Sequence, residues 1–594
     1  MVTLATPKTN GGTAPRPRRP RLTRAAWGCL IALCALFLLL LWRCPYGFDW
    51  SDEAYQSAVP YRLAMGDRPF IDTWEVHQLS GMIALPFLRV FLLFSGGATD
   101  GMLLFFRYLG VSIQFLVALY AFFVLRRAHG DVPAALCAGL VLMHSHYAMN
   151  NFFYNSMTLL FLLLSFLLLM DAACVRSGGA GRGETVRTAL SGAAYALSVL
   201  AYPYVVLTLP VWLLYWWRRV RRAEDRKPEK RALFVWLGGV LAPALLFAAF
   251  VLVRCPLREL WQNIGGMLHD PDHQSESLVH VMGYYFNAIR VLYGPAAYGA
   301  AALCAYGAAT CLVKRAAVQR RMRTLGLFFA AAVVLCELVW IVPYDYPAYH
   351  KITMAAAGLA MVAPGVYFLA GRRKSPLLWL YFLGCALSVA VQIGSNTRVR
   401  ASLGMLLPAS VASALYLVDT VRAAACGARL RRALTAAATA AVAAMLLLTA
   451  GLRLTAVYRD EPIPKLTARI ASGPAKGLRT TPESADKLAV LSAAVCDNAP
   501  ESGALLMTNL MPIGYLLTDL PPATPSCYNM TMDAAWLWDY YALHPARKPS
   551  YVFAAAEGYG ESNDLSLQGA AETFGADGAY RAVQTPAGTA YILD

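Results

Sequence analysis

Charged residues are scarce in this chain. Only 15% of its 594 residues are Asp, Glu, Lys or Arg, whereas 58% are hydrophobic; soluble domains average about 25% charged residues. The apolar residues gather in about a dozen runs of roughly 17 residues or more, with almost no charge inside them, which indicates membrane-spanning helices. This pattern excludes a soluble enzyme and a β-barrel porin.

Cysteine motifs are also missing. The 13 cysteines are scattered singly, without a CxxC pair or the Cys/His spacing of a zinc site, so neither a disulfide scaffold nor a structural metal is indicated. The formal net charge is +17. Nucleic-acid binders cluster Lys and Arg with aromatic residues on one solvated face, whereas here the basic residues lie in short loops, so no nucleic-acid partner is expected.

The apolar runs predict where the chain crosses the membrane. Residues 1–24 form a basic, Pro-rich cytoplasmic tail, and no small-x-small cleavage site follows the first run, which we therefore interpret as an uncleaved first span. The runs lie at residues 25–42, 79–94, 102–125, 132–149, 154–174, 188–217, 232–253, 292–313, 325–342, 351–370, 376–393, 401–419 and 432–452.

Basic residues predict the sidedness of these runs. Residues 1–24, 126–131, 175–187, 218–231, 314–323, 371–375 and 420–432 together hold 31 of the 52 basic residues and only five acidic ones. The positive-inside rule places all of them in the cytoplasm. Run 79–94 must then lie in the outer interface without crossing, and run 188–217 must cross twice, turning near Tyr202 and Pro203. The sequence therefore predicts 13 spans, with the N-terminus inside and the C-terminus outside.

Three long segments are extracytoplasmic in this topology: residues 43–101, 254–291 and 453–594. The last segment changes character, because its apolar stretches shorten to strand length at 503–508, 550–555, 579–584 and 589–593, with helical patterns near 483–496 and 563–573. The predicted architecture is an all-α polytopic membrane domain over 25–452, followed by a small α/β domain over 453–594 that is long enough to bury its own core.

The sharpest local motif follows the first span directly. It reads FDWSDEAYQSAVPYRLAMGDRPFIDTWEVHQLSG, at residues 48–81. In one interpretation Ser51 caps a helix whose first turn carries Asp52 and Glu53, a stabilisation of about 0.3 to 1 kcal/mol. In the other, these carboxylates are catalytic, and the sequence alone leaves both interpretations open.

The order of motifs over residues 25–220 resembles a known family. An uncleaved first span, an Asp-Glu pair opening the first outer loop, and an acidic-x-His stretch before a non-spanning helix are similar to the GT-C membrane glycosyltransferases, in the branch of the dolichyl-phosphate-mannose protein mannosyltransferases and aminoarabinose transferases. In the mannosyltransferases the last motif reads Phe-Asp-Val-His-Pro-Pro; here it is WEVHQL, at 74–79. The segment FYNS at 153–156 lies where that family has an outer-face Asp-Ser at the start of a span.

Several departures weaken the transfer of individual roles. Asn155 replaces a carboxylate, Gln78 and Leu79 replace the two prolines, and Tyr202 replaces a lysine before Pro203. The transfer of metal coordination and of a specific phosphate-binding lysine from the family is therefore weakened.

The resemblance implies transfer of one sugar from a polyprenyl-phosphate carrier to an acceptor at the outer face, with inversion of the anomeric carbon. A single displacement needs one carboxylate base near the acceptor, and Asp52 is the candidate, with Glu53 orienting the acceptor or its neighbour. The leaving phosphate needs cations or hydrogen-bond donors. The candidates for substrate binding are Glu75, His77, Asn155, Lys351, Arg398 and Arg400. The cations among them could instead be snorkelling at the interface.

A divalent metal is a further possibility to test, since Glu75 with His269 or His273 has suitable ligand chemistry, but the segment HDPDH at 269–273 is nonspecific and a solvated loop explains it better. Two rival functions remain at this point. One is a flippase or transporter of lipid-linked sugars; the other is a non-catalytic protein of cell-envelope glycan assembly. Against a transporter, the charges lie at one face and no inverted repeat is visible. The Ala-, Arg- and Leu-rich composition suggests a bacterial plasma membrane, with a glycan, lipid or protein as acceptor.

Overall fold

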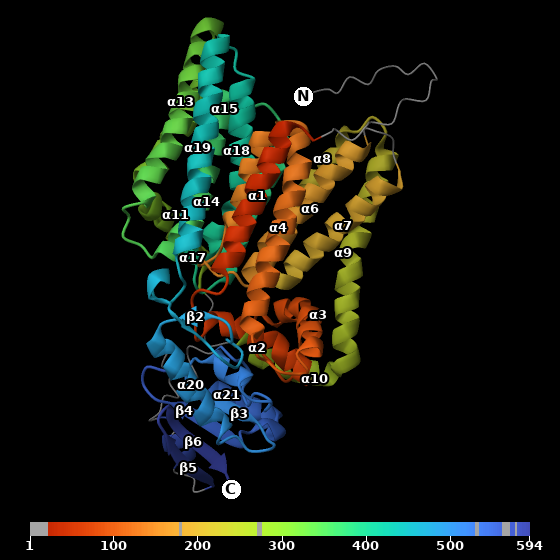
Figure 1. The fold of residues 1–594 in the computed structure, drawn as a ribbon. Coiled ribbons are helices and arrows are strands. Elements are labelled where there is room, and N and C mark those ends of the chain that lie inside the picture. The colour runs from red at the N-terminus through yellow and green to blue at the C-terminus, as the bar shows by residue number, and fades with distance from the viewer. Residues whose placement is uncertain are drawn as a thin grey trace.

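The computed structural model describes residues 22–176, 181–269, 276–528, 534–560, 569, 571–575 and 579–594. Long helices form a bundle, and the C-terminal segment, hereafter the tail (residues 453–594), is attached at one end of it (Figure 1). The helices of the bundle and its loops are α1 (Arg24–Arg43), α2 (Asp52–Met65), α3 (Gln78–Phe94), α4 (Met102–His129), α5 (Asp131–Met143), α6 (Tyr154–Arg176), α7 (Arg182–Ala201), α8 (Leu209–Arg222), α9 (Arg226–Arg254), α10 (Leu257–Leu268), α11 (Leu278–Tyr293), α12 (Pro295–Thr310), α13 (Ala316–Ile341), α14 (Ala348–Gly358), α15 (Ala363–Leu369), α16 (Leu377–Gly394), α17 (Val399–Ser402), α18 (Leu407–Arg422) and α19 (Ala428–Thr455). Short 3-10 turns join three pairs of them, at Pro203–Thr208, Leu359–Val362 and Leu403–Leu406.

Every predicted run coincides with a helix, but the predicted count of 13 spans is not confirmed. Within the described residues, nine spans are long and apolar enough to cross a membrane, or ten if α11 and α12, which are bent by 105°, form one broken span. The helices α5, α7 and α8 do not meet this criterion. Helices α5 and α8 have only 13 and 14 residues, and α7 carries buried serines.

Contacts bring the predicted cytoplasmic loops to one end of the bundle. Three of these contacts are Thr23–Asp131, Arg422–His129 and Arg187–Asp171. At the opposite end, α1 finishes beside the tail, where Arg43 donates a hydrogen bond of 2.5 Å to the carbonyl of Ala456. The alternation of the loops therefore agrees with the positive-inside assignment, while the side of the membrane that each end faces stays a prediction.

Helix α3 does not cross the bundle, as the sequence predicts. His77, just before it, stacks on Tyr154 at the start of α6 with ring centroids 3.8 Å apart, and Thr99, after it, donates to the carbonyl of Leu516 in the tail. Both ends of α3 thus lie at the tail end. Its exposed side chains Leu93 and Phe94 are apolar, which suits a helix in the membrane interface.

Helices α7 and α8 lead toward the tail end and back, but neither is among the described helices that are long and apolar enough to cross a membrane, so the predicted double crossing is not confirmed. Tyr202, after α7, packs near His77 at the tail end, and α8 returns so that Tyr215 contacts Trp379 at the start of α16. Helix α7 is polar for a span, but its buried hydroxyls are satisfied by α6; Ser198, for example, donates to the carbonyl of Thr158. Gly192 lets α7 approach α9 closely, since a Cβ there would lie 2.1 Å from the carbonyl oxygen of Trp236.

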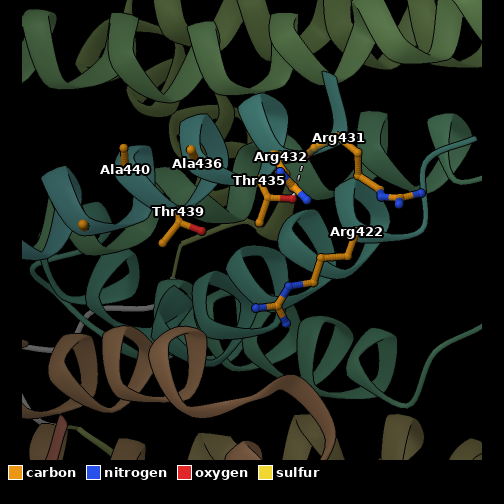
Figure 2. Close-up of a pocket in the computed structure, with 8 residues that line it drawn as sticks. Arg422, Arg431, Arg432, Thr435, Ala436, Thr439 and Ala440 are labelled. Carbon is orange, nitrogen blue, oxygen red and sulfur yellow. Dashed lines mark hydrogen bonds between the residues drawn. The ribbon is translucent and has the colours of Figure 1, made fainter. Parts of the chain in front are cut away.

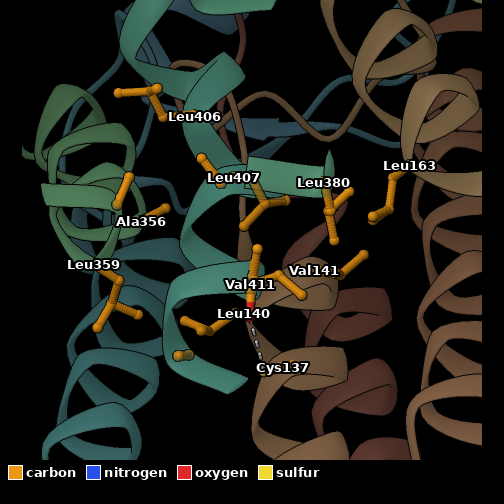
Figure 3. Packing of buried hydrophobic residues seen from close by; sticks show 14 of the residues in the cluster. Cys137, Leu140, Val141, Leu163, Ala356, Leu359, Leu380, Leu406, Leu407 and Val411 are labelled. Carbon is orange, nitrogen blue, oxygen red and sulfur yellow. Dashed lines mark hydrogen bonds between the residues drawn. The ribbon is translucent and has the colours of Figure 1, made fainter. Parts of the chain in front are cut away.

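The core of the bundle lies where α5, α16 and α18 meet (Figure 3). Val141, Leu380 and Val411 are fully buried there. Between membrane helices such packing stabilises by van der Waals contact rather than by removal of water. It holds together the helices whose tail-side ends carry the candidate site.

The tail has the predicted α/β composition. Its sheet contains β3 (Leu505–Met507), β4 (Tyr551–Ala555), β5 (Tyr580–Thr585) and β6 (Gly588–Leu593), in the order β3-β4-β6-β5, with β3 parallel to β4 and the other pairs antiparallel. All four predicted strands are present, as is the predicted helix, α20 (Pro482–Cys496). The segment 563–573 lies mostly outside the described residues. A short helical turn at Ala571–Gly575 overlaps its end. Elements that the sequence analysis missed are the two-residue strands β1 (Ala468–Arg469) and β2 (Arg479–Thr480), α21 (Ala534–Leu543), and short turns at Ile463–Lys465, Pro512–Leu516 and Pro545–Arg547.

The tail shares its core with the first outer loop. Val59 of α2 and Phe106 of α4 belong to the same buried apolar cluster as Met507 and Phe553 of the sheet. Independent folding of the tail stays a prediction, and this shared core argues against it. None of the 13 cysteines, all of which lie in the described part of the chain, forms a disulfide. In particular, Cys496 and Cys527 form no disulfide.

Candidate active site

Asp52 lies at the junction between the bundle and the tail, as the first residue of α2. The hydroxyl of Tyr458, just beyond the last span, donates a hydrogen bond to its Oδ2, and the guanidinium of Arg459 lies 3.7 Å from the same oxygen. The Asp52 side chain is 19% exposed. It is therefore a carboxylate that is both positioned by partners and reachable from solution.

Helix capping does not account for Asp52. The residue before α2, Ser51, makes no side-chain capping bond; instead its hydroxyl accepts a hydrogen bond of 2.7 Å from Arg459. The capping acceptor is Asp49, whose Oδ2 takes the backbone N–H of Glu53 at 3.0 Å. Ser51 does occupy the N-cap position, and Asp52 and Glu53 lie in the first turn as that interpretation predicts, but the capping bond from the Ser51 side chain is absent.

Asp49 is a second carboxylate in the same turn, but it is inaccessible. Burial and the neighbouring charge of Asp52 raise the pKa of Asp49 to about 7. Beside it lies a cavity of about 20 Å³ that is also lined by Tyr458. A cavity of this size accommodates about one water molecule. Asp49 can therefore hold a proton next to Asp52, which is the more exposed of the two carboxylates.

Aromatic hydroxyls surround Asp52. Burial and the charge of Asp52 raise the pKa values of Tyr458 and Tyr528, so both phenols stay protonated and act as donors. Tyr147 packs against Tyr458, with ring centroids 5.8 Å apart. Tyr147 and Ala148 both have positive φ angles, of 59° and 61°, a strained conformation for residues other than glycine that clusters at functional sites.

Glu53 faces away from this cluster and pairs with Arg107 of α4. Nε of Arg107 lies 2.6 Å from Oε1 of Glu53, and both side chains are buried. Arg107 also donates to the carbonyls of Cys44, Tyr46 and Gly47. The catalytic role expected for Glu53 stays a prediction, and these contacts support a positioning role, since they fix the turn that carries Asp52.

Glu75 is enclosed between the first outer loop and the tail. Its Oε2 accepts hydrogen bonds from Tyr55 at 2.9 Å and Ser526 at 2.8 Å, its Oε1 accepts the backbone N–H of Cys527, and Arg62 lies 3.8 Å away. Burial raises the pKa of this carboxyl group. These partners leave Glu75 no open face for substrate.

The expected metal ligands do not fit a metal centre. Both oxygens of Glu75 are engaged, His269 is exposed and its Nδ1 lies 2.7 Å from the carbonyl of Gly265, and His273 lies outside the described residues. No group of three His, Cys, Asp or Glu side chains in the described part of the chain is arranged to hold a metal. We derive no step through a metal ion.

His77 and Asn155 lie together at the start of α6. The imidazole of His77 is stacked on Tyr154 at 3.8 Å and on Tyr202 at 5.6 Å, and Asn155 is 1% exposed. The structure thus brings the end of the predicted outer-face stretch, the start of α6 and Tyr202 after α7 close to one another. The structure places His77 in an aromatic stack, and direct contact of either side chain with substrate stays a prediction.

The three candidate cations have different surroundings. Lys351 donates to the carbonyl of Val342 at the end of α13, which supports its interpretation as a helix-end contact. Arg398 pairs with Glu276 at 2.8 Å. Arg400 lies beside Tyr346.

Rings connect Arg400 to the surroundings of Asp52. Tyr346 stacks on His350 at 4.9 Å, and His350 contacts Tyr147 at 5.3 Å. Of the three cations chosen from the sequence, Arg400 is thus the one connected to the Asp52 cluster through this series of ring contacts.

The sequence analysis missed the partners of Asp52 that come from the tail. Tyr458 and Arg459 follow the last span at once, and Tyr528 lies in a loop after β3. The segment YRDEP at 458–462, charged and aromatic directly at a membrane boundary, is the signal that could have found the first two.

With this geometry described, the fold can be compared with known proteins. No family model and no curated protein sequence matches the chain. Among solved structures, it is similar to ArnT from Cupriavidus metallidurans bound to undecaprenyl phosphate, with a TM-score of 0.50 and 12% identity over 96% of this chain and 98% of that one. The chain shares the fold of this ArnT. The apo form of the same ArnT gives a TM-score of 0.44 and 14% identity over the same shares.

The likeness to ArnT confirms the fold that the motif order led us to expect. Because it covers 96% of the chain, it extends past residue 220, where the sequence resemblance ended, through the later spans and into the tail. At 12% identity it shows the fold alone, so the roles of single residues rest on the contacts described above.

Proposed function

We propose that this protein is a membrane glycosyltransferase that moves one sugar from a polyprenyl-phosphate carrier to an acceptor, with inversion at the anomeric carbon. The observation that carries the proposal is the accessible Asp52 carboxylate, held by Tyr458 and Arg459 where the bundle meets the tail. The ArnT-type fold supports it, since that ArnT structure holds undecaprenyl phosphate. We place the reaction at the outer face of a bacterial plasma membrane, on a glycan, lipid or protein acceptor.

The residues present suit a single displacement. Asp52 takes the proton of an acceptor hydroxyl or amine as that atom forms its bond to the anomeric carbon, and the bond from this carbon to the phosphate oxygen breaks. The carrier phosphate leaves with the bonding electrons. Arg459 and Arg400 are the cations we assign to the developing negative charge, in a site with little water.

The hydrogen bond from Tyr458 also orients the base. This bond holds Oδ2 of Asp52 in one position at the start of α2. Arg459 bridges Ser51 and Asp52 at the start of α2. Glu53 contributes through Arg107, by fixing the turn beneath.

Replacement of Asp52 by Asn tests the proposal. General-base assistance contributes about 100- to 10,000-fold in rate, so Asp52→Asn should transfer sugar at least about a hundredfold more slowly while inserting and folding normally. Asp100→Asn is the matched control, because Asp100 is an exposed carboxylate of the same outer loop, paired with Lys476. The assay measures transfer from a purified polyprenyl-phosphate sugar. A rate of transfer by Asp52→Asn close to that of wild type would show that Asp52 is not the general base.

A further inference from the structure

A second cavity lies at the opposite end of the bundle from Asp52. Its volume is about 600 Å³, and residues of α18 and α19 line it (Figure 2). Helix α19 runs from this end to the tail (Figure 1). The cavity is therefore remote from the proposed reaction.

The mouth of this cavity is strongly basic. Arg422 reaches it from α18, and Arg431 and Arg432 reach it from the first turns of α19. No acidic side chain lines it. Asp419, one turn before Arg422, is already bonded to His129 at 2.8 Å.

The arginines of α19 are free to bind an anion. Among the described residues, neither Arg431 nor Arg432 pairs with a carboxylate, and both side chains are exposed. Nη1 of Arg422 donates a hydrogen bond to the carbonyl of His129, and this bond holds the guanidinium in place. Thr435 and Thr439 also line the cavity, and the hydroxyl of Thr435 donates to the carbonyl of Arg431.

The rest of the cavity is apolar and continues along α19. It is lined by Ala436, Ala440 and Ala443. At about 1.5 Å per residue, the distance along the helix axis from Arg432 to Ala443 is roughly 16 Å. The lining therefore changes from cationic to apolar along the direction in which a lipid changes from headgroup to chain.

We propose that this cavity binds an anionic phospholipid of the adjacent leaflet, with its phosphate on the arginines and one acyl chain along the alanines. Guanidinium groups bind phosphate oxygens through paired hydrogen bonds, and basic pockets between spans on the cytoplasmic side suit anionic headgroups. The apolar half favours a lipid over a free phosphate. The site goes beyond the proposed transfer reaction and does not depend on it.

Native mass spectrometry of the purified protein in detergent tests this proposal. Phosphatidylglycerol is titrated against wild type, Arg431→Gln/Arg432→Gln and Arg429→Gln. Arg429 is the matched control, since it is an exposed arginine of the same helical turn that does not line the cavity. We expect the double variant to bind phosphatidylglycerol at least tenfold more weakly, and Arg429→Gln to bind like wild type.

A second variant tests the apolar half. Ala440 is exposed, so Ala440→Phe fills the cavity without disturbing a buried contact and should also weaken binding. Phosphatidylcholine should bind more weakly than phosphatidylglycerol, and inorganic phosphate at the same concentration should not displace the lipid. Equal binding by all variants, an equal loss in Arg429→Gln, or displacement by inorganic phosphate would each overturn the proposal.

Discussion

The buried pair between Glu53 and Arg107 gives the most quantitative prediction. Glu53→Gln keeps the size of the side chain but removes its charge, so the Arg107 guanidinium remains buried without a counter-ion. The two side chains are 4% and 7% exposed. Solvent therefore screens the loss only slightly.

Breaking a buried pair by removing one partner costs about 3 to 5 kcal/mol. Arg107 retains the carbonyls of Cys44, Tyr46 and Gly47, which still solvate part of its charge and favour the lower end of that range. The first turn of α2 also loses a stabilising negative charge, worth about 0.3 to 1 kcal/mol. We expect Glu53→Gln to lower the free energy of unfolding by about 3 to 4 kcal/mol.

Arg107→Met should cost more than Glu53→Gln. It removes the hydrogen bonds to the three carbonyls, worth about 1 kcal/mol each, and leaves the Glu53 carboxylate buried without its counter-ion. The double variant should lose less than the sum of the two, because the unpaired charge is then gone.

Denaturant-induced unfolding of the purified protein in detergent measures all three variants. Glu461→Gln is the control, since its pair with Lys465 is exposed and should contribute less than about 1 kcal/mol. Sugar transfer per folded molecule should fall less in Glu53→Gln than in Asp52→Asn. A change below about 0.5 kcal/mol in Glu53→Gln, or strictly additive effects in the double variant, would refute the reasoning.

Three further predictions concern other parts of the molecule. Burial raises the pKa of Asp49 to about 7. The stability that protonated Asp49 contributes is therefore complete below about pH 4 and is lost as the pH rises through 7. The thermal unfolding midpoint should fall between pH 4.5 and 8 in wild type, and should change less over this range in Asp49→Asn. Gly192→Val places a Cβ 2.1 Å from the carbonyl oxygen of Trp236, so it should destabilise by about 1 to 3 kcal/mol or more, measured as a lower unfolding midpoint than in Gly238→Val, where a Cβ meets open space. Arg459→Gln should slow transfer by about 100-fold with an unchanged unfolding midpoint, and a normal rate would remove Arg459 from the site.

The positions of helices and tail strands were predictable because they depend on local patterns. Apolar runs of span length predict helices, and apolar stretches of strand length such as 550–555 predict strands, from a few neighbouring residues alone. The alternation of basic loops then constrained residues 79–94 and 188–217 to a non-crossing helix and a double crossing. The number of spans was harder to predict, because helix α7 is polar and is stabilised by bonds to α6 that its own sequence does not reveal.

The partners of the site were predictable only in part. Asp52 could be selected from its place after the first span, but Tyr458 is 406 positions away in the chain, and no local pattern states that the two meet. The same limit applies to Glu75. The sequence made it a candidate for binding substrate or metal, whereas in the structure its carboxylate is hydrogen-bonded to Ser526 and Cys527. Hydrogen bonds between residues far apart in the chain thus determine which carboxylates are already bonded within the protein.

The enclosure of Glu75 has a consequence for biosynthesis. Its partner Ser526 is 451 residues later in the chain, and at about 5 to 20 residues per second the ribosome needs roughly 20 to 90 s to reach it. During that interval α1 and the first outer loop are already made, while Glu75 and Tyr55 must remain in water. The loop that carries Asp52 can therefore adopt its final arrangement only after the last segment has been made, so a prematurely terminated chain would expose unpaired carboxylates and apolar surface.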